Sequence, residues 1–247
     1  MNSRTAVVTG GASGIGAAIS RRLASDGAMV AILDIDGSAA EALASSISLS
    51  GGKAIGLTVD VTDRAAIDAG LNEARARLGR PTILVNSAGL SIDGPFLDLT
   101  AETWNRSLAI NLTGTFDCCQ AVLPDMIEEG WGRIVNISSS SIHSGAPGLA
   151  GYVAAKSGVV GLTKVLALEF AKYRITVNTI PPGFIDTPML RNTVEKGFID
   201  LEQQTAKTPV GRIGTPEDVA AVCAFLTSEE ASYVTGQSIG VNGGRNT

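Results

Sequence analysis

The stretch of sequence that decides the fold is Thr9-Gly10-Gly11-Ala12-Ser13-Gly14-Ile15-Gly16. It follows a short apolar run at residues 5–9 and precedes a helical pattern over about 14–26. Glycines at such a junction let the backbone turn sharply, approach a pyrophosphate and pack the helix against the strand. The amides that begin the helix then face the negative charge. Although the spacing is G-x-x-x-G-x-G and not G-x-G-x-x-G, its strand-to-helix context predicts a dinucleotide site.

The same alternation of strand and helix patterns continues along the 247 residues. The predicted strands are Thr5–Thr9, Met29–Leu33, Ala54–Val59, Thr82–Val85, Arg133–Ile137, Thr176–Ile180 and Ser238–Val241. The predicted helices cover about 14–26, 37–49, 63–78, 102–128, 151–172 and 215–227. The strands are continuously apolar, which is typical of a parallel sheet that is covered on both faces. The sequence therefore predicts one α/β domain over 1–247, a Rossmann-like doubly wound parallel sheet of about seven strands. Residues 186–212 are too irregular for an ordinary connection and predict a substrate lid or small extra helices.

The composition narrows the class of protein. Hydrophobic residues make up 45% and charged residues 17%, and the net charge is −5. This balance gives no electrostatic basis for binding nucleic acid or an anionic membrane. No apolar run approaches the ~20 residues that cross a bilayer, and a strand pattern beginning at Thr5 leaves no room for a signal peptide. Cys118, Cys119 and Cys223 lack metal-ligand spacing and are expected to be buried, so we expect a cytoplasmic protein without a metal site.

Asp34 ends the second predicted strand, eighteen residues after Gly16. A carboxylate at this point can accept hydrogen bonds from both hydroxyls of an adenosine ribose, and it repels a 2′-phosphate. No lysine or arginine lies in the glycine loop or beside Asp34 to offset that repulsion. The sequence therefore predicts NAD(H) in preference to NADP(H). Asp60 and Val61 end the third strand, where they either meet the adenine or, in the case of Asp60, cap the next helix.

A second chemical feature is the pentad Tyr152-Val153-Ala154-Ala155-Lys156. Residues four apart on a helix share one face. A free phenol titrates near pH ~10 and is a poor base at neutral pH, but a nearby ammonium favours the phenolate and lowers the pKa. Alone, this spacing also fits a packed tyrosine beside a solvated lysine. Together with the glycine loop, it predicts a proton donor and acceptor beside a bound dinucleotide.

With these motifs the chain resembles the short-chain dehydrogenase/reductase family, from the glycine loop to Asn242-Gly243-Gly244. The resemblance implies that Tyr152 is the general acid/base and that Lys156 lowers its pKa and binds the nicotinamide ribose. It implies that Ser139, thirteen residues before the tyrosine, polarises the substrate oxygen. Asn111 is implied to hold a water in the proton relay from the lysine, with a kink in its helix as an alternative role.

Two further motifs of the family line up with this chain. Asn86-Ser87-Ala88-Gly89 matches Asn-Asn-Ala-Gly except at Ser87, which leaves the role of the second asparagine open. Pro182-Gly183-Phe184-Ile185-Asp186-Thr187 matches Pro-Gly-x-x-x-Thr and implies that Ile185 and Thr187 fix the carboxamide, whereas the preceding Pro181 is atypical. The predicted cofactor-binding residues are Gly10, Ser13, Gly14, Ile15, Gly16, Asp34, Asp60, Val61, Asn86, Ala88, Gly89, Tyr152, Lys156, Pro182, Gly183, Ile185 and Thr187.

The sequence says less about the residues that bind the substrate than about those that bind the cofactor. His143 is the only histidine and lies four residues after Ser139, where it either lines the pocket or packs against the loop. The predicted substrate-binding residues are Ser139, Ser141, His143, Leu149, Met189 and Leu190. Further expected wall residues are Ser91, Ile92, Phe184, Val194 and Phe198. This mostly apolar set predicts a small or medium ketone or secondary alcohol as the substrate.

Two other functions fit parts of the sequence. A 3-oxoacyl-thioester reductase of the same family would use NADPH and dock an acidic carrier protein on basic residues, but Glu128-Glu129-Gly130 occupies one expected docking position. Only Lys172 and Arg174 occupy the other. A non-catalytic dinucleotide-binding regulator is the remaining alternative, and the intact catalytic residues count against it. The helices at 102–128 and 151–172 are apolar around their circumference, which together with the family habit predicts a homotetramer.

Overall fold

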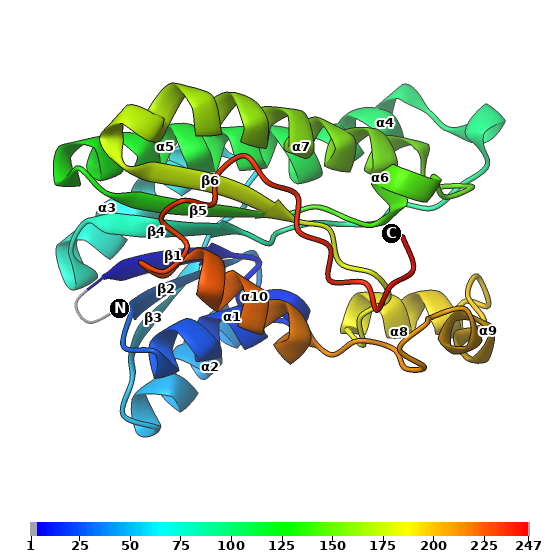
Figure 1. Ribbon diagram of the computed structural model, residues 1–247, viewed down its shortest axis with the longest axis horizontal. Coiled ribbons are helices and arrows are strands. Elements are labelled where there is room, and N and C mark those ends of the chain that lie inside the picture. The colour runs from blue at the N-terminus through cyan, green and yellow to red at the C-terminus, as the bar shows by residue number, and fades with distance from the viewer. Residues whose placement is uncertain (1–3, 247) are drawn as a thin grey trace.

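The computed structural model describes residues 4–246, which form one parallel sheet between two layers of helices (Figure 1). The six strands lie in the order β3-β2-β1-β4-β5-β6. Their bounds are β1 Thr5–Thr9, β2 Met29–Asp34, β3 Lys53–Thr58, β4 Pro81–Asn86, β5 Gly132–Ile137 and β6 Ile175–Ile180. All five pairings are parallel, so the predicted α/β doubly wound fold is confirmed.

Two apolar cores hold the helices on the sheet. On one face, α1 Gly14–Ser25, α2 Gly37–Leu49 and α10 Pro216–Leu226 pack around Ile19, Leu43 and Val219. On the other face, α3 Arg64–Leu78, α5 Gly114–Glu129 and α7 Ala150–Phe170 pack around residues such as Ile67 and Val122. The shorter elements are η1 Phe96–Asp98, α4 Ala101–Leu108, the π-helical turn η2 Ala109–Thr113, α6 Ser141–Ser144, η3 Ala171–Tyr173, α8 Pro188–Glu195 and α9 Leu201–Ala206. Both faces of the sheet are therefore covered, as its apolar strands require.

Of the three helices that follow the first three strands, α2 and α3 begin with an aspartate cap, whereas α1 does not. The Asp36 side chain accepts from the Ala39 amide at the start of α2, and that of Asp63 accepts from the amides of Ala65 and Ala66 at the start of α3. Ser13 precedes α1 in an extended conformation, and its side chain caps none of the described amides. Because the first amides of a helix need a partner, α1 presents free donors where the glycine loop ends.

The segment predicted as a seventh strand runs parallel to β6 but pairs with it only at two isolated bridges, Thr179 with Ser238 and Pro182 with Val241. The Thr179 amide donates to Gln237 and the Gly183 amide donates to Val241. Between them, the parallel pattern calls for an amide at residue 181 that donates to residue 239, and Pro181 has no N–H. The atypical proline therefore removes the hydrogen bond that would join the bridges into a strand.

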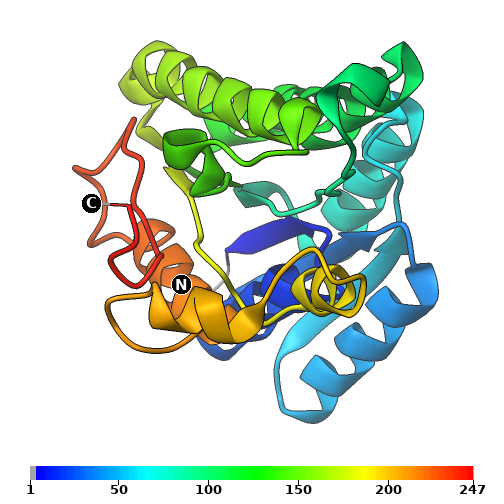
Figure 2. The same cartoon turned by 90° about the vertical axis from the view of Figure 1, so that its right-hand side faces the viewer.

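The site is positioned by the carboxyl ends of the strands. The register aligns Thr9 with Asn86 and Asn86 with Asn136, so β1, β4 and β5 end at one level. The chain leaves β1 toward β2 on one side, whereas β4 lies on its other side, which makes a switch point where ligands bind in such sheets. Residues 186–212 contain the two short helices α8 and α9 (Figure 2).

Candidate active site

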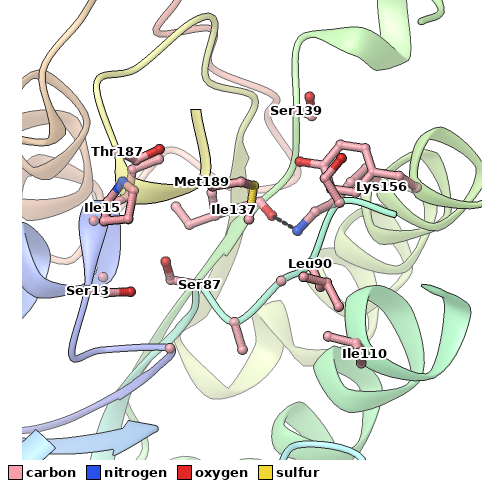
Figure 3. A pocket seen from close by; sticks show the side chains of 18 of the residues that line it. Ser13, Ile15, Ser87, Leu90, Ile110, Ile137, Ser139, Lys156, Thr187 and Met189 are labelled. Atoms are coloured by element: carbon pink, nitrogen blue, oxygen red, sulfur yellow. Dashed lines mark hydrogen bonds between the residues drawn. The ribbon is translucent and has the colours of Figure 1, made fainter. Parts of the chain in front are cut away.

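A cavity of about 750 Å³ opens at this switch point. The glycine loop lines it, together with Asp34 after β2 and the segment that follows β4. In Figure 3 the side chains of Ser13, Ile15 and Thr187 lie on one side of the cavity, and Ser139 and Lys156 lie on the other. Of the predicted cofactor residues, Asn86 is the one that is not among the lining residues of the described chain.

The glycine loop leaves its backbone accessible. Gly10 and Gly14 adopt left-handed φ angles of 59° and 48°, which favour glycine. A Cβ on Gly10 would lie 2.7 Å from the Ala88 Cα, and one on Gly16 would overlap the Gly10 carbonyl oxygen. Side chains at these positions are thus excluded, and the free amides at the start of α1 face the cavity. Such a backbone cradle fits the pyrophosphate of a dinucleotide.

Asp34 is held so that its carboxylate faces the loop. The Ala12 amide donates to Asp34 Oδ2 (3.0 Å), and the Asp36 amide donates to Asp34 Oδ1 (3.1 Å). A carboxylate offers about four acceptor positions, so two backbone donors leave room for ribose hydroxyls. Asp60 also lines the cavity, and its Oδ1 accepts from the amide and the hydroxyl of Thr62. The predicted helix-cap alternative for Asp60 is wrong, because Asp63 caps α3.

Asn86 supports the site from behind. It is buried, and its Nδ2 donates to Asn136 Oδ1 at 2.8 Å, which ties β4 to β5 below the cavity floor. This contact within the sheet gives Asn86 a structural role, and its contact with the cofactor stays a prediction. Ser87, the departure from the family motif, lines the cavity, and the amides of Ser87 and Ala88 both donate to the Thr9 hydroxyl. These bonds fix the close approach of this segment to Gly10.

The predicted catalytic residues meet at the opposite end. Ser139, Tyr152 and Lys156 all line the cavity, the first after β5 and the other two on α7. Lys156 is buried, and its Nζ donates to the Ile137 carbonyl at 2.8 Å (Figure 3). The same Nζ lies 5.8 Å from the centre of the Tyr152 ring. The Ser139 hydroxyl lies near enough to Tyr152 to act on the pKa of its phenol.

Burial changes the acid–base properties of this pair. It raises the pKa of Tyr152, and the hydrogen bond from Ser139 opposes the rise. Burial also lowers the pKa of Lys156 to about 8. The Ser139 hydroxyl therefore favours the phenolate against the effect of desolvation, and the lowering of this pKa by Lys156 that the resemblance implied stays a prediction.

Asn111 lies in the π-helical turn η2, which interrupts the helix predicted over 102–128. Its Oδ1 accepts from the Leu90 amide at 3.1 Å, and its Nδ2 donates to the carbonyls of Leu90 and Ser107. A π-helical turn often marks a functional position. The contacts give Asn111 a structural role, anchoring the segment after β4 beside Lys156, while the water relay stays a prediction.

The substrate end is only partly as predicted. Leu149, Met189 and Leu190 line the cavity, as do Ser91 and Phe184. The described residues that form its wall do not include Ser141, His143, Ile92, Val194 and Phe198, so the contact of these five with a substrate stays a prediction. His143 is exposed on the four-residue helix α6, and the Ser141 hydroxyl contacts that of Ser139.

Sequence reasoning missed several wall residues. They are Leu90, Arg106, Ala109, Ile110, Thr193 and Ile199. Arg106 and Ile110 lie four apart, so the face of the helix next to Asn111 was a usable signal. The others depend on where the chain after β4 and the helices α8 and α9 fold.

No helix within residues 4–246 is both long and apolar enough to span a membrane. In the same part of the chain, no three or more His, Cys, Asp or Glu residues gather in a way that could hold a metal ion.

Comparisons with known proteins agree with this geometry. Residues 10–246 match a family model described as enoyl-(acyl carrier protein) reductase. A (2S)-[(R)-hydroxy(phenyl)methyl]succinyl-CoA dehydrogenase subunit of Thauera aromatica is 40% identical over 99% of this chain and 97% of its own length. A 3-oxoacyl-[acyl-carrier-protein] reductase of Thermotoga maritima is 40% identical over 99% and 98%. A crystal structure of an actinorhodin polyketide ketoreductase variant with NADPH superposes with a TM-score of 0.95 at 36% identity, over 99% of this chain and 97% of the other.

Proposed function

The chain belongs to the short-chain dehydrogenase/reductase family and is an oxidoreductase, and we propose that it interconverts a secondary alcohol and a ketone with NAD(H). One observation supports this most: Ser139, Tyr152 and Lys156 line the same cavity as a glycine loop suited to a pyrophosphate. Tyrosine, serine and lysine side chains at one end of a dinucleotide site can hold an oxygen and move its proton.

The preference for NAD(H) rests on Asp34. Its carboxylate, fixed by the amides of Ala12 and Asp36, is proposed to accept from the adenosine ribose hydroxyls. A 2′-phosphate at this position would meet the same negative charge. The exposed side chain of Ile35, which follows it in the cavity wall, supplies apolar surface and no cation. Val61 offers a second apolar wall for the adenine.

The proposed mechanism follows from the catalytic end of the cavity. When bound, the nicotinamide supplies the acceptor or donor of hydride. In oxidation, the Tyr152 phenolate removes the alcohol proton while Ser139 donates a hydrogen bond to the same oxygen. In reduction, Tyr152 returns the proton to the ketone oxygen. Because burial raises the pKa of Tyr152, the oxidation rate should increase as the pH rises through the pKa of this phenol.

A thioester substrate is the second candidate, and the relatives favour it. The two curated relatives above are named for a CoA thioester and for an acyl-carrier thioester. The reacting group would be the same secondary alcohol or ketone. Two features count against a carrier-protein reductase. The carboxylate of Asp34 would repel the 2′-phosphate of NADPH in the proposed binding mode, and Glu128 and Glu129 pair with Arg80 where a basic docking surface would be needed.

We also propose an oligomeric state and a cellular location for the protein. Phe116 on α5 and Val165 and Leu168 on α7 are exposed apolar residues on the helices predicted to join subunits. They support a homotetramer through the α4–α5 and α7 regions. The chain would act as one domain with α8 and α9 forming the substrate lid, in the cytoplasm.

The test is a steady-state comparison of NADH and NADPH across ketones, secondary alcohols and acetoacetyl thioesters. The proposal expects turnover of ketones and secondary alcohols with a kcat/KM for NADH that exceeds that for NADPH. A preference for acetoacetyl thioesters with NADPH would replace it with the second candidate. Tight cofactor binding without turnover of any of these substrates would refute both candidate reactions. It would favour the non-catalytic dinucleotide-binding regulator.

A further inference from the structure

Ser141 contacts the catalytic serine with two groups. Its Oγ lies 2.8 Å from Ser139 Oγ, and its amide donates to Ser139 Oγ at 3.3 Å. Ser141 begins the short helix α6 and is not among the described residues that line the cavity, whereas Ser139 is. Its contacts with Ser139 are therefore the route by which we expect it to act on the substrate.

The hydrogen-bonding capacity of Ser139 decides the direction of the contact between the two hydroxyls. A serine hydroxyl has one proton to donate and two lone pairs that accept. One lone pair accepts the Ser141 amide, and in the proposed mechanism the proton of Ser139 is donated to the substrate oxygen. The second lone pair is then the only group left for Ser141 Oγ, so Ser141 must be the donor.

We propose that Ser141 is a positioning residue, which donates its hydroxyl to Ser139 Oγ and thereby directs the Ser139 proton toward the reacting oxygen. This role rests on the proposed function. Without the Ser141 hydroxyl, the proton of Ser139 can rotate away, because only the amide still holds its oxygen. The serine would then be a weaker donor to the substrate oxygen and to the Tyr152 phenolate.

The surroundings of Tyr152 make this effect measurable. The charged residues in the cavity wall are Asp34, Asp60, Asp93, Arg106 and Lys156. Burial raises the pKa of Tyr152, and the Ser139 hydroxyl opposes that rise. A change at Ser141 alters no charge, so a shift in the pKa of Tyr152 would have to come through Ser139.

The experiment compares Ser141→Ala and Ser141→Thr with wild type, and uses Ser144→Ala as the matched control. Ser144 is on the same short helix, but its hydroxyl donates to the Gly145 carbonyl. Measurements are kcat and KM over pH, NADH affinity, and the phenol absorbance titration, from which the Tyr152→Phe titration is subtracted. The subtraction isolates Tyr152 from Tyr173 and Tyr233, and needs no turnover.

We expect Ser141→Ala to lower kcat roughly 3- to 10-fold, the effect of losing one neutral hydrogen bond, with KM and NADH affinity nearly unchanged. The pKa of Tyr152 should rise in that variant, and Ser141→Thr should restore both values. Equal kcat and equal titration in wild type and Ser141→Ala would overturn the proposal, as would the same change in Ser144→Ala. Failure of wild type to turn over any alcohol or ketone would instead refute the proposed function, and the titration would still test Ser141.

Discussion

Replacing Asp34 by asparagine removes one negative charge at the predicted adenosine-ribose position and changes the side-chain volume little. In wild type, the carboxylate accepts from the amides of Ala12 and Asp36. A phosphate monoester carries about −1.5 to −2 charge at neutral pH. At a separation of ~5 Å, each pair of unit charges repels by about 0.8 kcal/mol in bulk water and by about 3 kcal/mol at an effective dielectric constant of ~20.

With about 1.5 to 2 charges on the phosphate, these limits become about 1.2 and about 6 kcal/mol. Because the half-buried Asp34 keeps contact with water and salt, the repulsion relieved in Asp34→Asn should lie in the lower half of that range, at about 1–3 kcal/mol. The ratio of kcat/KM for NADPH to that for NADH should therefore rise roughly 5- to 150-fold. Part of the rise will come from weaker NADH binding, because asparagine offers a single acceptor oxygen to donors that met two. The assay is initial-rate kinetics with each cofactor and one saturating ketone.

Asp36→Asn is the matched control. Asp36 is exposed, and its side chain caps α2 by accepting from the Ala39 amide. Asparagine caps a helix about as well as aspartate, so this variant changes the net charge equally and should leave the cofactor ratio within about twofold. An unchanged ratio in Asp34→Asn, or an equal change in both variants, would refute the assignment of Asp34 as the residue that excludes the 2′-phosphate.

Three further perturbations test other parts of the account. Lys156→Met should abolish a pH dependence of stability, because the pKa of Lys156 is about 8 in the folded protein and 10.5 in a free lysine. As the pH rises from 8 to 10.5, the free energy of unfolding of wild type should increase by up to about 3 kcal/mol relative to the variant. If urea unfolding shows a constant difference between the two proteins over this range, the effect of burial on Lys156 is contradicted. Gly16→Ala should weaken NADH binding at least ~10-fold, because the added Cβ would overlap the Gly10 carbonyl. Gly94→Ala is the control and should bind NADH like wild type, since the space around its Cβ is open. Equal NADH affinities of the two variants in fluorescence titration would argue against binding of the pyrophosphate by the glycine loop. Leu168→Glu should dissociate the proposed tetramer, and light scattering would show the lower mass. Leu49→Glu, at an exposed site of α2, should leave the mass unchanged. A mass that is unchanged in both variants would show that α7 is not part of a subunit interface.

Much of the fold was predictable because its determinants are local. The continuously apolar strands, the helix caps and the glycine loop each lie within a few consecutive residues, and the position of Asp34 follows from the end of β2. The seventh predicted strand differs for a reason that was visible in the sequence, since Pro181 lacks the amide needed to continue the pairing. The π-helical turn at Asn111 was not visible, because one extra residue in a turn leaves the apolar pattern of 102–128 almost unchanged.

The candidate site was less predictable where it depends on packing. Motif spacing indicated Ser139, Tyr152 and Lys156, but the pKa values of the last two depend on burial that only the folded chain determines. The substrate wall depends on the path of short elements: α6 leaves His143 exposed and Ser141 outside the cavity wall, and α4 brings Arg106 to the cavity. Residues four apart on one helix face offered the only sequence signal for Arg106 and Ile110.

The central claim is that the Tyr152 hydroxyl exchanges the substrate proton beside a bound nicotinamide dinucleotide. Tyr152→Phe tests it, with Tyr233→Phe as the control because Tyr233 is fully exposed. The measurement is NADH affinity by fluorescence together with kcat/KM for a ketone that wild type reduces. The account predicts that Tyr152→Phe binds NADH within about twofold of wild type and loses roughly 10²- to 10⁴-fold in kcat/KM, while Tyr233→Phe is unaffected. Turnover like that of wild type in Tyr152→Phe would contradict it.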